Sequence, residues 1–249
     1  MDRYFPHEKL QVYAKAVDFA TRSAALSSNW DKKHSVVDHL CRAAESLLLN
    51  LAEAARRQSA PGRLNLVDYA IGSSLECAAC LDIAYIKRLL TEWQCDQAKH
   101  QLCEVTKMLV GLRKGWSLAL ELREDSSSSE ENTEASQPQP FFHHERLEVY
   151  RDGLGFMQWF VAQPGGLELS HRLFRQIDQA ATGLVLNIAE GNGRYAELDH
   201  HRFLQIAANC SVKVAVYLDL SESKALLESS EISKGKEFLR RIAAMLAGM

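Results

Sequence analysis

Two pairs of residues in this chain of 249 have a spacing that could support chemistry. The first pair is Cys77 and Cys80, whose thiolates could bind a metal ion together with a second pair of ligands. The sequence holds six cysteines and nine histidines, but none is placed to complete such a site. We therefore interpret both cysteines as small residues of a helical core, and we expect no metal and no other cofactor.

The second pair is Arg194 and His200, with His201 directly after it. An arginine that polarises a phosphate and a histidine that acts as general acid–base could form the site of a helical-bundle ribonuclease. This spacing arises easily by chance, and the simpler interpretation is a polar surface pair near a helix N-terminus. We expect that the protein is not an enzyme, and ribonuclease activity stays open as an alternative.

The segments that carry these residues belong to an internal repeat. A motif at residues 7–13, HEKLQVY, returns 137 positions later as HERLEVY. At the same distance, LLLNLAEAARR at 47–57 returns as LVLNIAEGNGR. One constant distance without insertions indicates two copies of one unit, which we place at residues 1–122 and 144–249. Residues 123–143 between them are acidic and rich in Ser and Pro, which predicts a disordered linker.

Apolar residues recur every three or four positions through both copies, as in helices with one buried face. In the first copy they predict helices that start near Leu10 and after Asp31, followed by helices over about 64–93 and 96–122. We interpret SAPG at 59–62 as the break between the second and third helices. Short connections between long helices favour antiparallel neighbours. The predicted fold is therefore all-α, with two tandem up-down antiparallel four-helix bundles.

The composition, with 47% hydrophobic and 24% charged residues, is typical of a soluble globular protein. A net charge of −3 excludes a globally basic nucleic-acid binder, although a local basic patch remains open. We see no apolar run of the roughly 18–20 residues that a membrane span needs. The first residues carry no signal-peptide pattern. We expect a cytoplasmic protein that does not contact a membrane.

The second helix of each copy carries an unexpected stripe. A helical projection places one leucine opposite the core residues, beside three polar residues, and both copies keep this arrangement. The stripe consists of Leu49, Asn50, Glu53 and Arg57 in the first copy, and of Leu186, Asn187, Glu190 and Arg194 in the second. A solvated face with one stray leucine is the alternative interpretation, but a simple surface helix has no reason to keep this set in both copies. We therefore predict that the stripe is buried between bundles and that the protein forms an oligomer.

Basic residues of the first copy gather near two helix ends, where they could contact the phosphates of a nucleic acid. These residues are Arg56, Arg57, Arg63, Lys87 and Arg88. Solvated helix faces explain such residues as well. Direct RNA or DNA binding through these residues is therefore an alternative function.

The repeated motifs also resemble a known family. They include DYAIGSSLECAACLD at 68–82 and, in the second copy, RFLQIAANCSVKVAVYLD at 202–219. With the motifs quoted above, they make the chain similar, twice and over nearly its whole length, to four-helix-bundle proteins encoded in 23S rRNA intervening sequences. That family includes the accessory variability protein of diversity-generating retroelements, which binds a reverse transcriptase and nucleic acid. The resemblance implies a non-enzymatic scaffold or adaptor that assembles with itself and binds a larger protein, such as a reverse transcriptase or another nucleic-acid enzyme.

Overall fold

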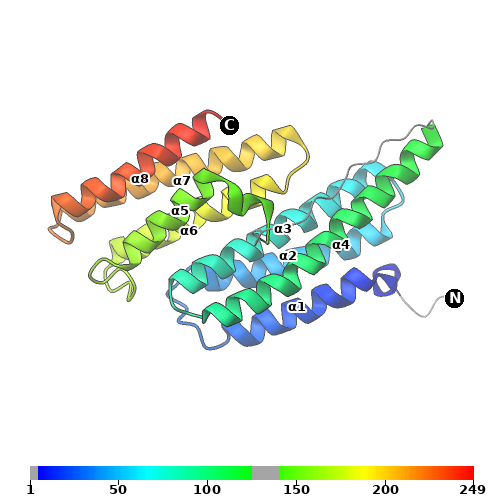
Figure 1. The fold of residues 1–249 in the computed structure, drawn as a ribbon, viewed down its shortest axis with the longest axis horizontal. Coiled ribbons are helices and arrows are strands. Elements are labelled where there is room, and N and C mark those ends of the chain that lie inside the picture. Colours follow the sequence, from blue (N-terminus) through cyan, green and yellow to red (C-terminus); the bar gives the residue numbers. More distant parts are fainter. Residues whose placement is uncertain (1–4, 125–140) are drawn as a thin grey trace.

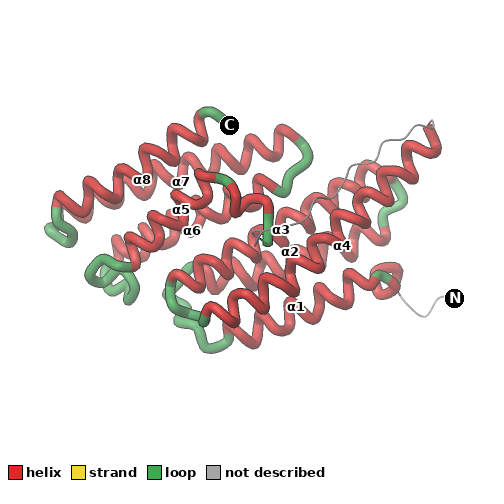
Figure 2. Tube along the Cα trace, viewed as in Figure 1, coloured by secondary structure: helices red, strands yellow, loops and turns green. Residues whose placement is uncertain are grey.

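The computed structural model describes residues 5–124 and 141–249, and all regular elements in this part of the chain are helical (Figure 2). Each copy begins with a short 3-10 helix, followed by four α-helices. The first copy contains η1 (Pro6–Lys9), α1 (Gln11–Ser27), α2 (Val36–Arg56), α3 (Ala60–Ile86) and α4 (Glu92–Glu124). The second contains η2 (His143–Arg146), α5 (Glu148–Val161), α6 (Arg172–Asn192), α7 (Glu197–Ser223) and α8 (Ser229–Ala247). The predicted all-α fold is confirmed.

In both copies the four helices pack in the same cyclic order. Helices α1 and α3 each lie against α2 and α4, and α5 and α7 each lie against α6 and α8. This is the neighbour relationship of an up-down four-helix bundle. The two bundles lie side by side, with α3 and α6 at the centre of the molecule (Figure 1).

The predicted boundary between the second and third helices needs a correction. Residues of the expected break form the start of α3, which begins at Ala60 with Pro61 in its first turn. Proline is tolerated there because the first N–H groups of a helix have no partner within the helix. The chain turns just before it, where the Arg63 side chain donates hydrogen bonds of 2.6 and 3.1 Å to the carbonyl of Arg57.

The third helix also ends earlier than predicted, at Ile86 instead of near Trp93. Arg88 follows with a φ of 58°, a left-handed conformation that terminates a helix. The equivalent residue of the second copy, Ala225, has a φ of 51° after α7. The same turn therefore ends the third helix in both copies, although neither residue is a glycine.

The predicted linker at 123–143 is too long at both ends. Helix α4 continues to Glu124, and Phe142 is buried with 5% of its surface exposed. The Cys103 thiol donates a hydrogen bond of 3.5 Å to the carbonyl oxygen of Phe141. The rest of the predicted disordered linker, residues 125–140, lies outside the described residues. Phe141 thus packs against α4 of the first bundle, ahead of the predicted start of the second bundle at 144.

Candidate interaction surface between the bundles

Helix α3 is buried on several sides at once, because α2, α4 and the second bundle all pack against it. Leu75, Ala79 and Ile83 recur every four residues on this helix, and all are less than 10% exposed. On the other side of the contact, Leu186 of α6 is 2% exposed. The equivalents of the three α3 residues on α7, which has no bundle packed against its outer side, are at least 40% exposed, so docking of the second bundle accounts for the burial of this apolar centre, and that burial favours docking.

Two glycines allow α3 and α6 to approach closely at one end of this contact. A Cβ added to Gly193 would lie 3.0 Å from the Cα of Gly72 and 2.9 Å from Leu75. A Cβ added to Gly72 would lie 3.0 Å from the guanidinium carbon of Arg194. A larger residue at Gly193 would press on backbone, so the present spacing of the helices depends on this glycine.

A buried ion pair joins the bundles at the other end. The ammonium group of Lys87 donates a hydrogen bond to Asp178, and both residues are at most 2% exposed. The backbone N–H and hydroxyl of Ser35 also donate to Asp178, at 3.2 and 2.9 Å. Burial lowers the pKa of Lys87, and the Asp178 charge opposes this shift. Lys87 therefore stabilises the contact between bundles and is not available to a phosphate, contrary to its predicted role.

A second polar network joins α3 and α4 to the start of the second bundle. Lys99 lies 2.7 Å from carboxylate oxygens of both Asp82 and Glu145. The Tyr150 hydroxyl donates a 2.9 Å hydrogen bond to the other oxygen of Asp82. Lys99 is 7% exposed, and its two carboxylate partners raise its pKa although burial lowers it. Two acidic neighbours thus compensate the buried charge of Lys99.

The polar part of the second stripe lies at this contact as well. Arg194 forms an ion pair with Glu190, and its guanidinium lies 4.7 Å from the ring centre of Tyr69 in α3. The pKa of Glu190 is raised to about 7, first by burial and then by the negative charge of Glu76 in α3. Two carboxylates that face each other across the contact make this part of the interface electrostatically unfavourable at high pH.

The equivalent stripe of the first copy faces away from the second bundle. Leu49 is 70% exposed, and Arg57 pairs with Glu53 at 2.9 Å in an exposed ion pair. Asn50 donates hydrogen bonds to Ser46 on its own helix. Within one chain, the structure thus places the second stripe between the bundles and leaves the first uncovered.

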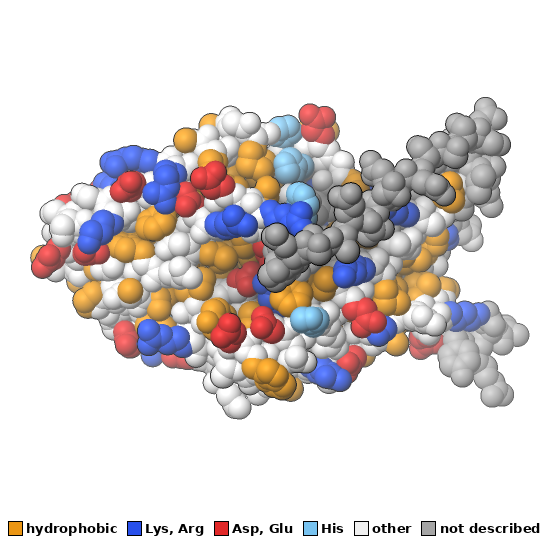
Figure 3. Space-filling model, in the orientation of Figure 1, with side chains coloured by type: hydrophobic (Ala, Val, Ile, Leu, Met, Phe, Trp, Pro, Cys, Tyr) orange, Lys and Arg blue, Asp and Glu red, His pale blue; other side chains and the backbone are white. Residues whose placement is uncertain are grey.

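The remaining predicted phosphate contacts do not form one cluster. Arg56 and Arg57 are exposed at the end of α2, whereas Arg88 lies at the opposite end of α3. The Arg63 guanidinium lies 4.6 Å from the ring centre of Trp116, in addition to its bonds to Arg57. On the face shown in Figure 3, acidic and basic side chains alternate rather than forming a single basic surface. Arg56 and Arg57 remain as an exposed basic pair.

The two sequence pairs considered for chemistry are both in packed surroundings. Cys77 and Cys80 are fully buried, and burial raises the pKa of each thiol. The Arg194 side chain is 7% exposed and paired with Glu190, while the Nδ1 of His200 lies 2.8 Å from the carbonyl of Gly191. Among the described residues, no group of three or more His, Cys, Asp or Glu could hold a metal ion.

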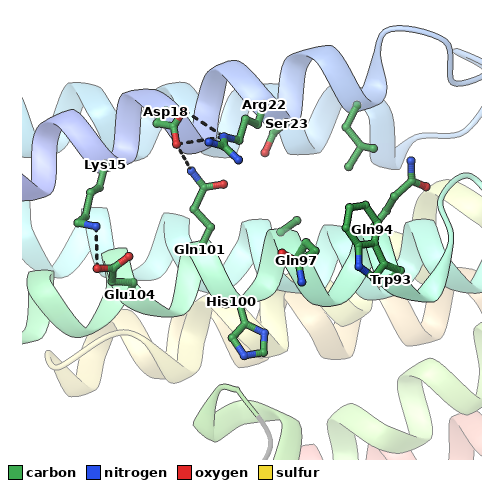
Figure 4. Close-up of a pocket in the computed structure, with 12 residues that line it drawn as sticks. Lys15, Asp18, Arg22, Ser23, Trp93, Gln94, Gln97, His100, Gln101 and Glu104 are labelled. Carbon is green, nitrogen blue, oxygen red and sulfur yellow. Dashed lines mark hydrogen bonds and ion pairs between the residues drawn. The ribbon is translucent and has the colours of Figure 1, made fainter.

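A groove lies between α1 and α4 (Figure 4). Polar groups pair across it: Lys15 forms an ion pair with Glu104 at 2.7 Å, and the amide of Gln101 donates a 2.7 Å hydrogen bond to Asp18. His100 points away from this groove and packs against Phe141 at 4.6 Å between ring centres. The groove thus presents paired charges that hold α1 against α4, rather than an arrangement for acid–base chemistry.

Helix α7, the equivalent of α3, has an exposed apolar side. Val212, Val216 and Leu220 are 61%, 50% and 40% exposed. By length and composition alone, α3 and α7 could each cross a membrane, contrary to the expectation that no apolar run is long enough for a span. Most of α3 is buried inside the protein, whereas most of α7 is not. The exposed side of α7 is therefore an apolar surface that no element of the described residues covers.

Comparison with known families matches the repeat. The family model described as 23S rRNA-intervening sequence protein matches residues 8–111 and again residues 145–248. The two matched ranges are 137 positions apart at both ends. No curated protein and no solved structure matches the chain.

Proposed function

The chain belongs, through both of its copies, to the family of 23S rRNA-intervening sequence proteins, and we propose that it acts as a non-enzymatic scaffold. In this role it assembles with itself and holds a larger partner protein through exposed helix faces. By resemblance, a reverse transcriptase or another nucleic-acid enzyme fits as the partner, and the cytoplasm as the location.

The exposed side of α7 is the observation that carries this proposal. Three aliphatic residues at a spacing of four, each at least 40% exposed, form a stripe suited to the apolar side of another helix. The equivalent stripe of α3 already binds a helix of the second bundle. Packed thiols and paired charges at the other candidate positions favour a binding role over catalysis.

A pull-down with the purified full-length chain tests the scaffold proposal. The bait is the wild-type chain or its Val216→Asp variant, in which a charge enters the middle of the α7 stripe. We expect a partner protein to be retained by the wild type and lost with the variant, because a buried charge without a partner opposes docking. Leu118→Asp is the matched control, since Leu118 is 55% exposed on α4. Equal retention by all three baits would contradict the proposal.

Direct nucleic-acid binding is the second candidate, and the exposed pair Arg56 and Arg57 favours it. Filter binding of labelled RNA and DNA over a range of salt concentrations tests it. Phosphate contacts require that affinity falls steeply as salt rises. The charge reversal Arg56→Glu with Arg57→Glu should then abolish binding without loss of helicity, because both side chains are exposed. Unchanged affinity in this variant would exclude the basic pair.

A further inference from the structure

The contact between the two bundles uses different surfaces on each: α3 and α4 of the first copy, and α6, α5 and η2 of the second. Because the copies are equivalent, the second bundle has its own version of the α3 surface on α7 and α8. The first bundle has its own version of the α6 surface on α2, α1 and η1. Within the described part of the chain, neither version packs against the other bundle.

We propose that the α7 and α8 surface of one chain binds the α2 and η1 surface of a second copy, repeating between chains the contact that joins the bundles within a chain. This inference rests on the proposed function and identifies the partner in self-assembly as a second copy of the chain. Each added chain leaves one surface of each kind free, so the assembly is head-to-tail and either grows as a filament or closes into a ring.

The apolar centres of the two free surfaces correspond to the buried centre within the chain. On α7, Val212, Val216 and Leu220 stand at the positions of Leu75, Ala79 and Ile83. The α3 residues are at most 7% exposed, whereas their α7 equivalents are at least 40% exposed. On α2, Leu49 stands at the position of Leu186 and is 70% instead of 2% exposed. Both halves of a dry centre are thus present and uncovered.

The polar network around Lys99 also has equivalent residues on the two free surfaces. Asp219 and Lys236 stand at the positions of Asp82 and Lys99, and they form an ion pair with each other. Glu8 and Tyr13 stand at the positions of Glu145 and Tyr150. All four residue types are identical between the copies; Glu8 and Asp219 are exposed, whereas Tyr13 and Lys236 are half-buried. Docking of a second chain would bring Glu8 and Tyr13 to Asp219 and Lys236.

One charge difference favours the contact between chains over the contact within a chain. Inside the chain, Glu76 of α3 faces Glu190 of α6 and raises its pKa. At the equivalent positions of the free surfaces, α7 carries Lys213 and α2 carries Glu53. The repulsive pair thus becomes an attractive one. Such complementarity favours a second copy over an unrelated apolar partner.

Two other differences set the geometry of the contact between chains. The contact between chains cannot reproduce the close approach of Gly72 and Gly193, because the equivalent residues are Asn209 and Arg56. The helices must therefore lie farther apart at that end. At the other end, the acidic partner of Lys87 is replaced by Cys41, so the buried ion pair is missing. We expect this contact to be weaker than the one within the chain and to respond to protein concentration.

Two single variants and their mixture test the proposal by light scattering and sedimentation. Leu49→Asp blocks the α2 surface and leaves α7 intact, whereas Val216→Asp does the opposite. Each variant alone should stay at the 28.0 kDa of one chain, with unchanged helicity by circular dichroism. Mixed together, they should form a dimer that cannot grow, because one intact surface remains on each chain. Leu118→Asp is the control and should assemble like the wild type.

Charge reversal tests the register of the contact. Lys213→Glu would place a carboxylate against Glu53 and should weaken assembly at least tenfold, while Lys213→Glu combined with Glu53→Lys should restore it. Mixed variants that do not dimerise, or a double reversal without rescue, would overturn the proposal. A monomeric wild type whose α7 stripe binds vesicles of anionic lipid would also overturn it in favour of a membrane. A monomeric wild type that still retains a partner protein would overturn it as well, while leaving the scaffold function in place.

Discussion

Removal of the Asp178 carboxylate is the sharpest test of how the bundles hold together. In Asp178→Ala the ammonium group of Lys87 loses its counter-ion while its side chain stays about 1% exposed. Loss of one partner of a buried pair costs about 3–5 kcal/mol, because the remaining charge is neither solvated nor compensated. The N–H and hydroxyl of Ser35 also lose their acceptor. We therefore expect the free energy of unfolding to fall by about 3–5 kcal/mol.

Urea unfolding of the full chain, followed by circular dichroism, measures this loss. With a denaturant dependence near 3 kcal/mol per molar, the midpoint should fall by roughly 1–2 M. The pH dependence gives an independent check. Without Asp178 the pKa of Lys87 is lowered further, so the unfolded state binds more protons and stability rises with pH. The loss caused by the mutation should therefore shrink as the pH is raised.

The double variant Lys87→Met with Asp178→Leu serves as the matched control. It removes both charges and keeps apolar volume in their place, so its stability should lie within about 1–2 kcal/mol of the wild type. If Asp178→Ala were as stable as the wild type, Lys87 would reach solvent and the bundles would not be docked as described. A double variant as unstable as the single one would show that lost packing, rather than the unpaired charge, is responsible.

Two further predictions concern the titration of Glu190 and the reactivity of the cysteines. The pKa of Glu190 is raised from 4.5 to about 7, so the folded state keeps this proton to higher pH than the unfolded state does. The free energy of unfolding should therefore fall by roughly 3 kcal/mol between pH 4.5 and pH 7. Glu190→Gln should remove this part of the pH dependence of thermal unfolding, and an unchanged pH dependence would refute the assignment. Alkylation with iodoacetamide should label the exposed Cys41 of the isolated chain rapidly and the buried Cys77 and Cys80 only after unfolding. Labelling of Cys41 should slow as protein concentration rises, because Cys41 lies on the α2 surface; a rate independent of concentration would count against assembly there.

The sequence was sufficient to predict the helices and the repeat, because both depend on local and periodic signals. Helical spacing of apolar residues and one constant distance of 137 positions define two bundles without any tertiary information. The errors lie at helix ends. At the start of α3, proline and glycine favour both a loop and the first turn of a helix, and only the packing of the chain decides between them.

The pairing of the two bundles was only partly visible in the sequence. The leucine stripe signalled an interface, since Leu49 and Leu186 lie off the core side of their helices. Which helix covers Leu186 depends on a contact between residues far apart in the chain, and no local pattern encodes it. The network of Asp82, Lys99 and Tyr150 left a signal that could have been used, because each residue recurs 137 positions before or after. Lys87 recurs as Lys224, but its partner Asp178 does not recur, so that ion pair was hidden.

The mass of the wild-type chain in solution, measured by sedimentation from nanomolar to high micromolar concentration, tests the central claim most directly. We expect a single chain of 28.0 kDa at the lowest concentrations and a rising mass as chains join head-to-tail. A mass of 28.0 kDa across the whole range would contradict it.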